Sequence, residues 1–184
     1  MSKLENLSNL SKEANALFFN SFEKFHYKRD SFILNVNEVC NYFYYLNKGS
    51  IRIFYMKDDK EITEWISLEN HFFVSIISFF ERSKSQLIIK SIEEVEIYGI
   101  SHDNLMMLSA ENKEINQFYH YSLIQSLILS QKRMYSIQFH TAQEKYQNLI
   151  ENQAEIIKRI PLTYIASFLG ITLETLSRIR AKVG

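Results

Sequence analysis

The residues best suited to chemistry lie near the end of the chain, where Glu174, Ser177 and Arg178 stand at spacings of three and one. On a helix, residues three or four apart share one face. An arginine can bond to guanine O6 and N7, a glutamate can accept from cytosine N4, and a serine hydroxyl can bond to a phosphate or a base edge. The chemistry that this pattern predicts is recognition of double-stranded DNA. A charged, solvated face on a C-terminal helix is the alternative.

The segment from residue 160 to residue 183 must position these side chains, and its sequence predicts two short helices joined by a tight turn. Pro161 suits the start of a helix, where a missing N–H costs nothing. Gly170 predicts the end of that helix, because the residue after a helix often needs a positive φ. Thr172 can cap the second helix, in which Leu176 and Ile179 fall on the inward face. The result is a predicted helix-turn-helix, and its second helix carries the DNA-binding groups.

Hydroxyl and basic side chains on both helices complete the predicted surface, because both kinds suit contacts to phosphates. The predicted DNA-binding residues are Thr163, Thr172, Glu174, Thr175, Ser177, Arg178, Arg180 and Lys182. Basic residues outnumber acidic ones here, although the formal net charge of the whole chain is +0. A local basic surface on a neutral chain is compatible with a DNA-binding domain.

Short runs rich in β-branched and aromatic residues fill much of the first hundred residues and predict strands. Turn signals such as Gly49 and the polar run 57–60 separate them. The predicted strands are residues 31–36, 41–46, 50–56, 61–67, 87–92 and 95–100, after a partly helical stretch over residues 1–30. Strands this short, with no long helix between them, predict an antiparallel sandwich or roll.

Three stretches carry a resemblance to a known family. The run Glu174-Thr-Leu-Ser177-Arg178 resembles the Glu-x-x-Ser-Arg run on the recognition helix of Crp/Fnr regulators. Residues 45–55 resemble the strand–Gly–strand hairpin of the cyclic-nucleotide-binding β-roll, and residues 78–80 resemble its phosphate-cassette region. The resemblance covers roughly residues 15–183 and is similar to the short members of Bacteroidetes type.

This resemblance implies an α+β fold with three parts. They are an N-terminal antiparallel β-roll (a double-stranded β-helix or jelly roll, like the cyclic-nucleotide-binding domain), a long dimerisation helix and a C-terminal helix-turn-helix. It also implies a cytoplasmic, homodimeric, DNA-binding transcription regulator with a small-molecule effector in the roll.

The sequence departs from the family where a cyclic nucleotide would bind. The family uses a Gly-Glu pair for the ribose and an Arg-Ser/Thr pair for the cyclic phosphate. With the strand end at Ile100 and Ser101 as reference, these positions hold Ser75 and Ile76, and Ser85 and Gln86, while Arg82 lies three positions away. A buried phosphate without a cationic partner is costly. We therefore expect no classical cAMP or cGMP binding, and either another effector or none.

Residues 101–140 predict a helix, and the part from 115 to 139 contains no Gly or Pro. One apolar stripe, spaced near 3.5 residues, consists of Leu123, Leu127, Met134 and Ile137. A neighbouring stripe consists of Tyr121, Ile124, Ile128 and Tyr135. Because the two stripes are too wide for one contact surface, we expect one to lie on the roll and the first to form a dimer interface. A helix buried inside a monomer is the alternative.

Domain boundaries follow from these elements. The run Thr141-Ala-Gln-Glu144 is a capping box, which opens a new helix directly after the long one. We therefore expect a sensor roll over residues 1–110, a dimerisation helix over 111–140 and a helix-turn-helix domain over 141–184.

Composition excludes several other classes. Apolar residues make up 46% and charged residues 23%, as in globular proteins. The single Cys40 cannot form an internal disulfide, which fits a reducing cytoplasm, and neither a signal peptide nor a membrane span is expected. Without a phosphate loop, paired metal ligands or a nucleophile motif, we expect no enzyme, no cofactor and no metal. The open alternative is a small-molecule-binding β-roll whose helical tail mediates protein association.

Overall fold

The computed structural model describes residues 4 and 10–183, with side chains to residue 182. The chain divides into two compact units. The first contains Met1–Ile53 and Ser67–Gln125, and the second contains Phe54–Ile66 and Ser126–Gly184. The second unit therefore joins the outer part of one hairpin to the C-terminal helices.

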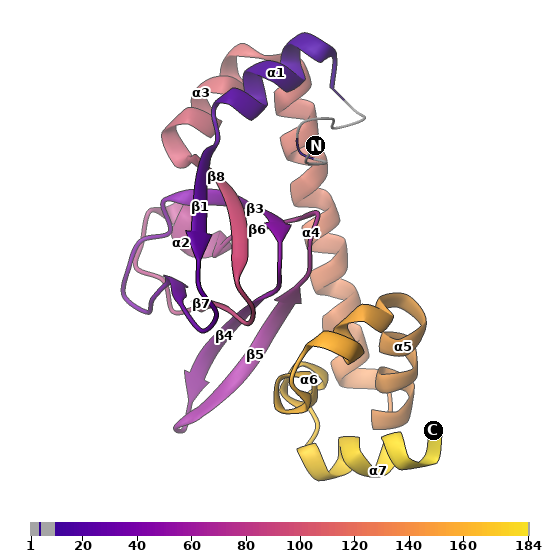
Figure 1. The fold of residues 1–184 in the computed structure, drawn as a ribbon. Coiled ribbons are helices and arrows are strands. Elements are labelled where there is room, and N and C mark those ends of the chain that lie inside the picture. The colour runs from indigo at the N-terminus through magenta and orange to yellow at the C-terminus, as the bar shows by residue number, and fades with distance from the viewer. Residues whose placement is uncertain (1–3, 5–9, 184) are drawn as a thin grey trace. The chain divides into compact units, whose positions relative to one another are not determined.

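Two four-stranded sheets form the roll (Figure 1). The first has the order β1-β8-β3-β6, with β1 at Glu23–Tyr27, β8 at Val95–Ser101, β3 at Tyr42–Lys48 and β6 at His71–Phe73. The second has the order β2-β7-β4-β5, with β2 at Phe32–Leu34, β7 at Ile88–Ser91, β4 at Ile51–Lys57 and β5 at Lys60–Ser67. The pairs β1–β8, β2–β7, β3–β6 and β3–β8 are antiparallel. The predicted double sheet is confirmed.

One predicted feature of the N-terminal stretch is incomplete. Helix α1 spans Lys12–Asn20, as a partly helical segment predicts, but strand β1 follows at Glu23–Tyr27. Phe25 and Tyr27 are half-buried, whereas the residues between and before them are exposed. This alternation is a strand signal, but it extends over only two apolar residues and is weakened by charged neighbours.

A series of aromatic contacts runs through the first unit. Phe43 stacks on Phe72 with ring centroids 5.0 Å apart, and Phe72 meets Phe118 edge-on at 5.7 Å. Tyr45 and Phe79 are almost fully buried. Burying a side chain of this size stabilises the fold by roughly 1.5–3 kcal/mol, so these rings bind the sheet to the start of the long helix.

The predicted helix over residues 101–140 is interrupted. Helix α3 spans His102–Glu111 and helix α4 spans Lys113–Phe139, with Asn112 in an extended conformation between them. The Asn112 side-chain oxygen accepts hydrogen bonds from the backbone N–H groups of Glu114 and Ile115 at 3.0 and 3.1 Å. Because these N–H groups lack partners within a new helix, the asparagine caps α4 and the chain can change direction there.

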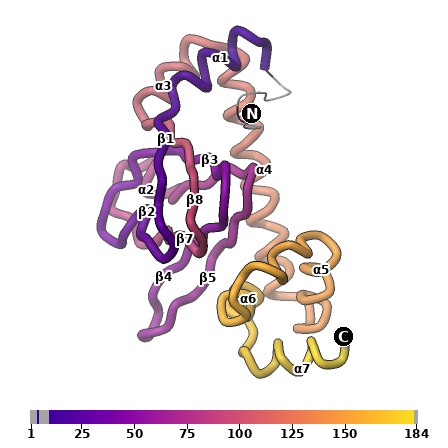
Figure 2. The backbone as a smooth tube through the Cα atoms, viewed as in Figure 1, coloured from indigo at the N-terminus to yellow at the C-terminus, as the bar shows by residue number. Residues whose placement is uncertain are grey.

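Three further helices follow α4 in the second unit, and Figure 2 traces the chain through them to its yellow end. They are α5 at Ala142–Arg159, α6 at Leu162–Leu169 and α7 at Leu173–Val183. The predicted capping box is confirmed, because Thr141 and Glu144 hydrogen-bond each other's backbone N–H groups. Within α5, Gln153 has non-helical angles, φ −147° and ψ 49°, so the helix is broken there.

Candidate DNA-binding surface and effector roll

The turn between α6 and α7 forms as the sequence predicts. Gly170 has φ 66° and lies in the left-handed region, and no atom lies within 4 Å of the position that a Cβ would take. The Gly170 N–H donates to the Ser167 carbonyl at 3.1 Å, and the Ile171 N–H donates to the Ala166 carbonyl at 3.0 Å. These bonds satisfy carbonyls at the end of α6.

The start of α7 is capped by Thr172, also as predicted. The Thr175 N–H donates to the Thr172 hydroxyl at 3.1 Å, and the two threonine hydroxyls lie 2.9 Å apart. A cap of this kind fixes the first turn of the helix. The cap therefore fixes the start and direction of α7, the helix that carries Glu174 and Arg178.

A small apolar core holds the two helices together. Ile165, Ala166 and Leu169 of α6 are buried, and Leu176 of α7 is fully buried. Helix α5 adds Tyr146, Leu149 and Ile156 to the buried set. Because the apolar face of α7 is used in this core, its polar face must point away from it.

The predicted DNA-binding residues lie on the outside of this core. Thr163 is exposed in the first turn of α6, and Thr175 is half-buried beside the cap. The exposed residues at the start and along α7 are Thr172, Glu174, Ser177, Arg178, Arg180 and Lys182. Glu174 and Arg178 are four residues apart on one helix, so both can reach the same base pairs.

Charge on α7 favours a polyanionic partner. Arg178, Arg180 and Lys182 stand against the single acidic residue Glu174. Cations near a helix C-terminus also interact favourably with its dipole. The helix thus offers two groups suited to base edges, Glu174 and Arg178, together with basic groups suited to phosphates.

The roll contains the positions at which the sequence lacks the family's ribose-binding and phosphate-binding pairs. Ser75 and Ser85 are both buried, and their hydroxyl oxygens lie 2.9 Å apart. The Ser85 hydroxyl also donates to the Leu87 carbonyl at 2.9 Å and accepts from the Leu87 N–H at 3.0 Å. The two short side chains therefore satisfy each other and the adjacent backbone, with no cation in this group.

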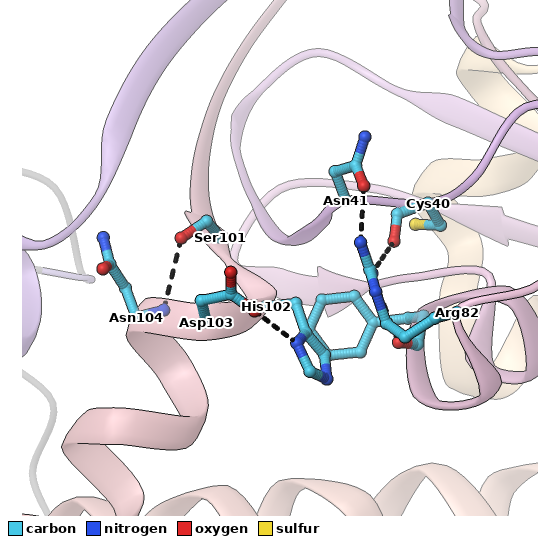
Figure 3. Close-up of polar contacts among 8 residues, drawn as sticks. Cys40, Asn41, Arg82, Ser101, His102, Asp103 and Asn104 are labelled. Carbon is cyan, nitrogen blue, oxygen red and sulfur yellow. Dashed lines mark hydrogen bonds and ion pairs between the residues drawn. The ribbon is translucent and has the colours of Figure 1, made fainter.

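Arg82 lies three positions before Ser85, and its guanidinium is used elsewhere (Figure 3). It ends α2 (Ile76–Glu81) in the left-handed region with φ 52°. Its Nη1 donates to the Cys40 carbonyl at 3.0 Å, and its Nη2 donates to the Asn41 side-chain oxygen at 2.6 Å. The guanidinium thus holds the loop before β3.

His102 and Cys40 lie near this arginine without forming a reactive site. The His102 ring packs edge-on against Phe79 at 5.1 Å, and its Nδ1 lies 3.0 Å from the Asp103 carboxylate (Figure 3). Cys40 is buried, and this burial raises the pKa of its thiol. A raised pKa lowers the thiolate fraction, so Cys40 is a poor nucleophile.

Helix α4 carries a broad apolar surface. Within α4, the buried residues are Ile115 and Tyr119 near its start. Of the predicted dimer residues, Leu127, Met134 and Ile137 are exposed and Leu123 is half-buried. The neighbouring stripe of Tyr121, Ile124, Ile128 and Tyr135 is exposed as well. The expectation that this stripe would lie on the roll is wrong for Tyr121 and Ile124, because both belong to the same unit as most of the roll and are exposed.

Two other kinds of site are absent from the part of the chain that the structure describes. No described helix is long and apolar enough to cross a membrane. Among the same residues, no group of three or more His, Cys, Asp or Glu side chains could hold a metal ion.

Comparison with known proteins gives the fold a context. Residues 24–112 match the cyclic nucleotide-binding domain family. FixK2 from Bradyrhizobium japonicum aligns with a TM-score of 0.74 at 18% identity, with 88% of this chain and 84% of that chain covered. A protein described as a crp/fnr-family transcriptional regulator from Eubacterium rectale aligns with a TM-score of 0.70 at 17% identity, with 92% and 82% covered. The chain has the Crp/Fnr fold.

A third Crp/Fnr-like structure is the c-di-GMP responsive regulator CLP from Xanthomonas campestris. It aligns with a TM-score of 0.73 at 15% identity, with 94% of this chain and 91% of that chain covered. No curated protein matches the chain by sequence. The matched domain and the shared fold confirm the α+β fold class predicted from the sequence, and they confirm the resemblance to Crp/Fnr regulators at the level of the fold.

Proposed function

We propose that the chain is a DNA-binding transcription regulator of the Crp/Fnr type that acts as a homodimer in the cytoplasm. The observation that carries this proposal is the exposed polar face of α7, where Glu174, Ser177 and Arg178 stand on a capped helix. In a helix-turn-helix, the second helix enters the major groove and its first turns contact base edges. The residues at those turns here are of the types that recognise cytosine, phosphate and guanine.

The homodimer rests on the apolar surface of α4. Leu127 is 60% exposed, and Met134 and Ile137 lie about two and three turns farther along. A second copy of the same helix would cover such a stripe, because identical stripes are self-complementary across a two-fold axis. Two helix-turn-helix units on one dimer would then bind two half-sites of inverted sequence.

The effector of the roll differs from cAMP and cGMP in this proposal. Ser75, at the position of the family's ribose pair, bonds Ser85, at the position of its phosphate pair, and Arg82 is held by Cys40 and Asn41. A related regulator, CLP, is described as c-di-GMP responsive, so effectors other than cAMP occur on this fold. The proposed regulator either binds a different effector in the roll or acts without one.

Fluorescence anisotropy on random duplex DNA at two salt concentrations tests the proposal. A protein that neutralises Z phosphates loses affinity with a slope of about −0.9Z in a plot of log K against log [salt]. We expect a slope of about −4 or steeper, since a dimer would bring several basic groups to the backbone. The alternative, a β-roll sensor whose helical tail mediates protein association, predicts no binding and no slope.

A further inference from the structure

The outer edge of strand β5 is occupied by side chains from two helices of the same unit. Sheet order places β5 last, so only one of its edges pairs with another strand. The Thr63 N–H donates to the Ser167 hydroxyl of α6 at 2.8 Å, and that hydroxyl donates to the Glu61 carbonyl at 3.2 Å. Exposed edges present such groups to solvent or to other strands. Here Ser167 satisfies them in place of a strand.

Arg133 of α4 joins the same edge to the end of α6. Its Nη2 donates to the Thr63 carbonyl at 2.9 Å and to the Phe168 carbonyl at 3.2 Å. The guanidinium lies over the Phe168 ring at 5.1 Å, and Trp65 of β5 meets that ring edge-on at 6.0 Å. Phe168 lies in the last turn of α6, whose carbonyls lack helical partners and attract a cation.

The side chain of Arg133 is partly buried from solvent. Burial lowers the pKa of its guanidinium, and the Glu64 carboxylate opposes that shift. Its Nε is buried and has no hydrogen-bond partner among the described residues. An arginine that is desolvated to this extent is held by several neighbours at once, so its loss would release all of them.

The covalent path from α4 to α6 contains two points at which the chain can bend. It passes through the junction at residues 140 and 141 and through the break in α5 at Gln153. Helix ends and breaks are places where a chain can bend. The contacts of Ser167 and Arg133 bypass both points, because they connect α4, β5 and α6 directly.

We propose that Ser167, Arg133 and the backbone of residues 61–63, here named the β5 clasp, fix the helix-turn-helix relative to α4 and so set the distance between the two recognition helices of a dimer. The clasp uses α6 and leaves Glu174 and Arg178 of α7 exposed, so it is compatible with bound DNA. Ser167 and Arg133 are positioning residues, since they act through α6. This inference rests on the proposed function, because spacing has meaning only for a dimer on DNA.

The test uses the full chain and two duplexes, one with two inverted half-sites chosen from random sequence and one with a single half-site. Ser167→Ala removes the acceptor of the Thr63 N–H, and Ser167→Thr keeps a hydroxyl. We expect Ser167→Ala to weaken binding to the two-half-site duplex about tenfold, the size of one lost part-buried hydrogen bond. Binding to the single half-site should be unchanged, and Ser167→Thr should restore the wild-type value.

The preferred distance between the two half-sites is a second readout, and partial unfolding of a variant would not change it. Wild-type protein should lose affinity when one base pair is inserted between the half-sites, whereas Ser167→Ala should lose much less. Arg133→Gln should behave like Ser167→Ala, and Lys132→Met, an exposed neighbour on α4, is the matched control and should behave like wild type. Sedimentation checks that every variant remains a dimer.

Hydrogen exchange at the Thr63 amide checks that the bond to Ser167 is lost, and DNA binding separates failure of this inference from failure of the proposed function. Ser167→Ala should accelerate exchange at that amide. If wild-type protein binds no duplex, the proposed function fails. If wild-type protein binds with a spacing preference and Ser167→Ala keeps it, or loses full-site and half-site binding equally, the β5 clasp does not set the spacing.

Discussion

Ser75 and Ser85 share a buried hydrogen bond, with their hydroxyl oxygens 2.9 Å apart, and stand at the positions where the family has its ribose pair and its phosphate pair. Ten residues separate them along the chain, so the fold, and not the local sequence, brings them together. Ser85 also binds the backbone of Leu87. A phosphate at this point would have to break these bonds without gaining a charged donor from either serine.

Neither cAMP nor cGMP should therefore bind at physiological concentrations. A buried phosphate needs a charged donor, and neither serine supplies one. Titration calorimetry with each nucleotide should give no measurable heat of binding. Ser85→Ala, which removes one hydroxyl but adds no cation, should give the same result. A micromolar dissociation constant for either nucleotide would show that another cation reaches the site.

Local signals explain what the sequence could predict. The helix-turn-helix was predictable because Gly170 and Thr172 act on their own neighbours, through a positive φ and a cap. The capping box at Thr141 and Glu144 is local in the same way. Strand β1 was missed because Phe25 and Tyr27 alone carry its apolar face.

Long-range contacts explain what the sequence could not predict. Arg133 lies 70 residues from Thr63, and Ser167 lies 104 residues from it. Each residue is unremarkable in its own helix, and only the position of β5 gives it a role. The exposure of Ile124 in the second α4 stripe, which is 54%, could not be predicted from the sequence either. Helical spacing shows that a face is apolar, but it does not show what covers that face.

Gly49→Ala should destabilise the roll strongly. Gly49 has φ +90°, and an added Cβ would lie 2.8 Å from Val95 Cγ1 and in conflict with the Glu94 carbonyl. We expect a loss of at least about 2 kcal/mol in the free energy of unfolding, since both strain and overlap contribute. Urea denaturation measures it. Gly170→Ala is the matched comparison, because its Cβ would meet open space, and it should cost only about 1 kcal/mol.

The capping box should make the stability of the C-terminal helices depend on pH in the acid range. Hydrogen bonds from the Thr141 backbone N–H and hydroxyl lower the pKa of Glu144. A carboxyl group with a lowered folded pKa stabilises the fold above its unfolded pKa of about 4.3, and the effect is lost as the pH falls through the folded pKa. Glu144→Gln should therefore lower the melting temperature at pH 7 but change it little near pH 2. An equal effect at both pH values would contradict this origin.

Leu127→Lys should convert the protein to monomers. Leu127 is 60% exposed on the predicted dimer stripe, and a buried lysine at an interface would lose its hydration without gaining a partner. Sedimentation velocity measures the change, and DNA affinity should fall with it because two half-sites share one dimer. Leu129→Lys is the matched control, since Leu129 is 42% exposed but lies off both stripes. A Leu127→Lys protein that stays dimeric would remove α4 from the interface.

Arg178→Ala should change which sequences the protein prefers. Arg178 is exposed one turn beyond Glu174 and can bond bidentately to guanine. Its loss should cost about 1–3 kcal/mol on the preferred site and reduce discrimination at one G·C pair.

Lys182→Ala separates base recognition from general attraction to DNA. Lys182 is exposed in the last turn of α7, where it can contact a phosphate but not the base pairs near Glu174. Its removal should weaken binding to all duplexes alike and reduce the salt slope by about one unit. Selection from random duplexes should give the wild-type consensus for Lys182→Ala and a relaxed one for Arg178→Ala. If Arg178→Ala kept the wild-type consensus, α7 would not be the recognition helix.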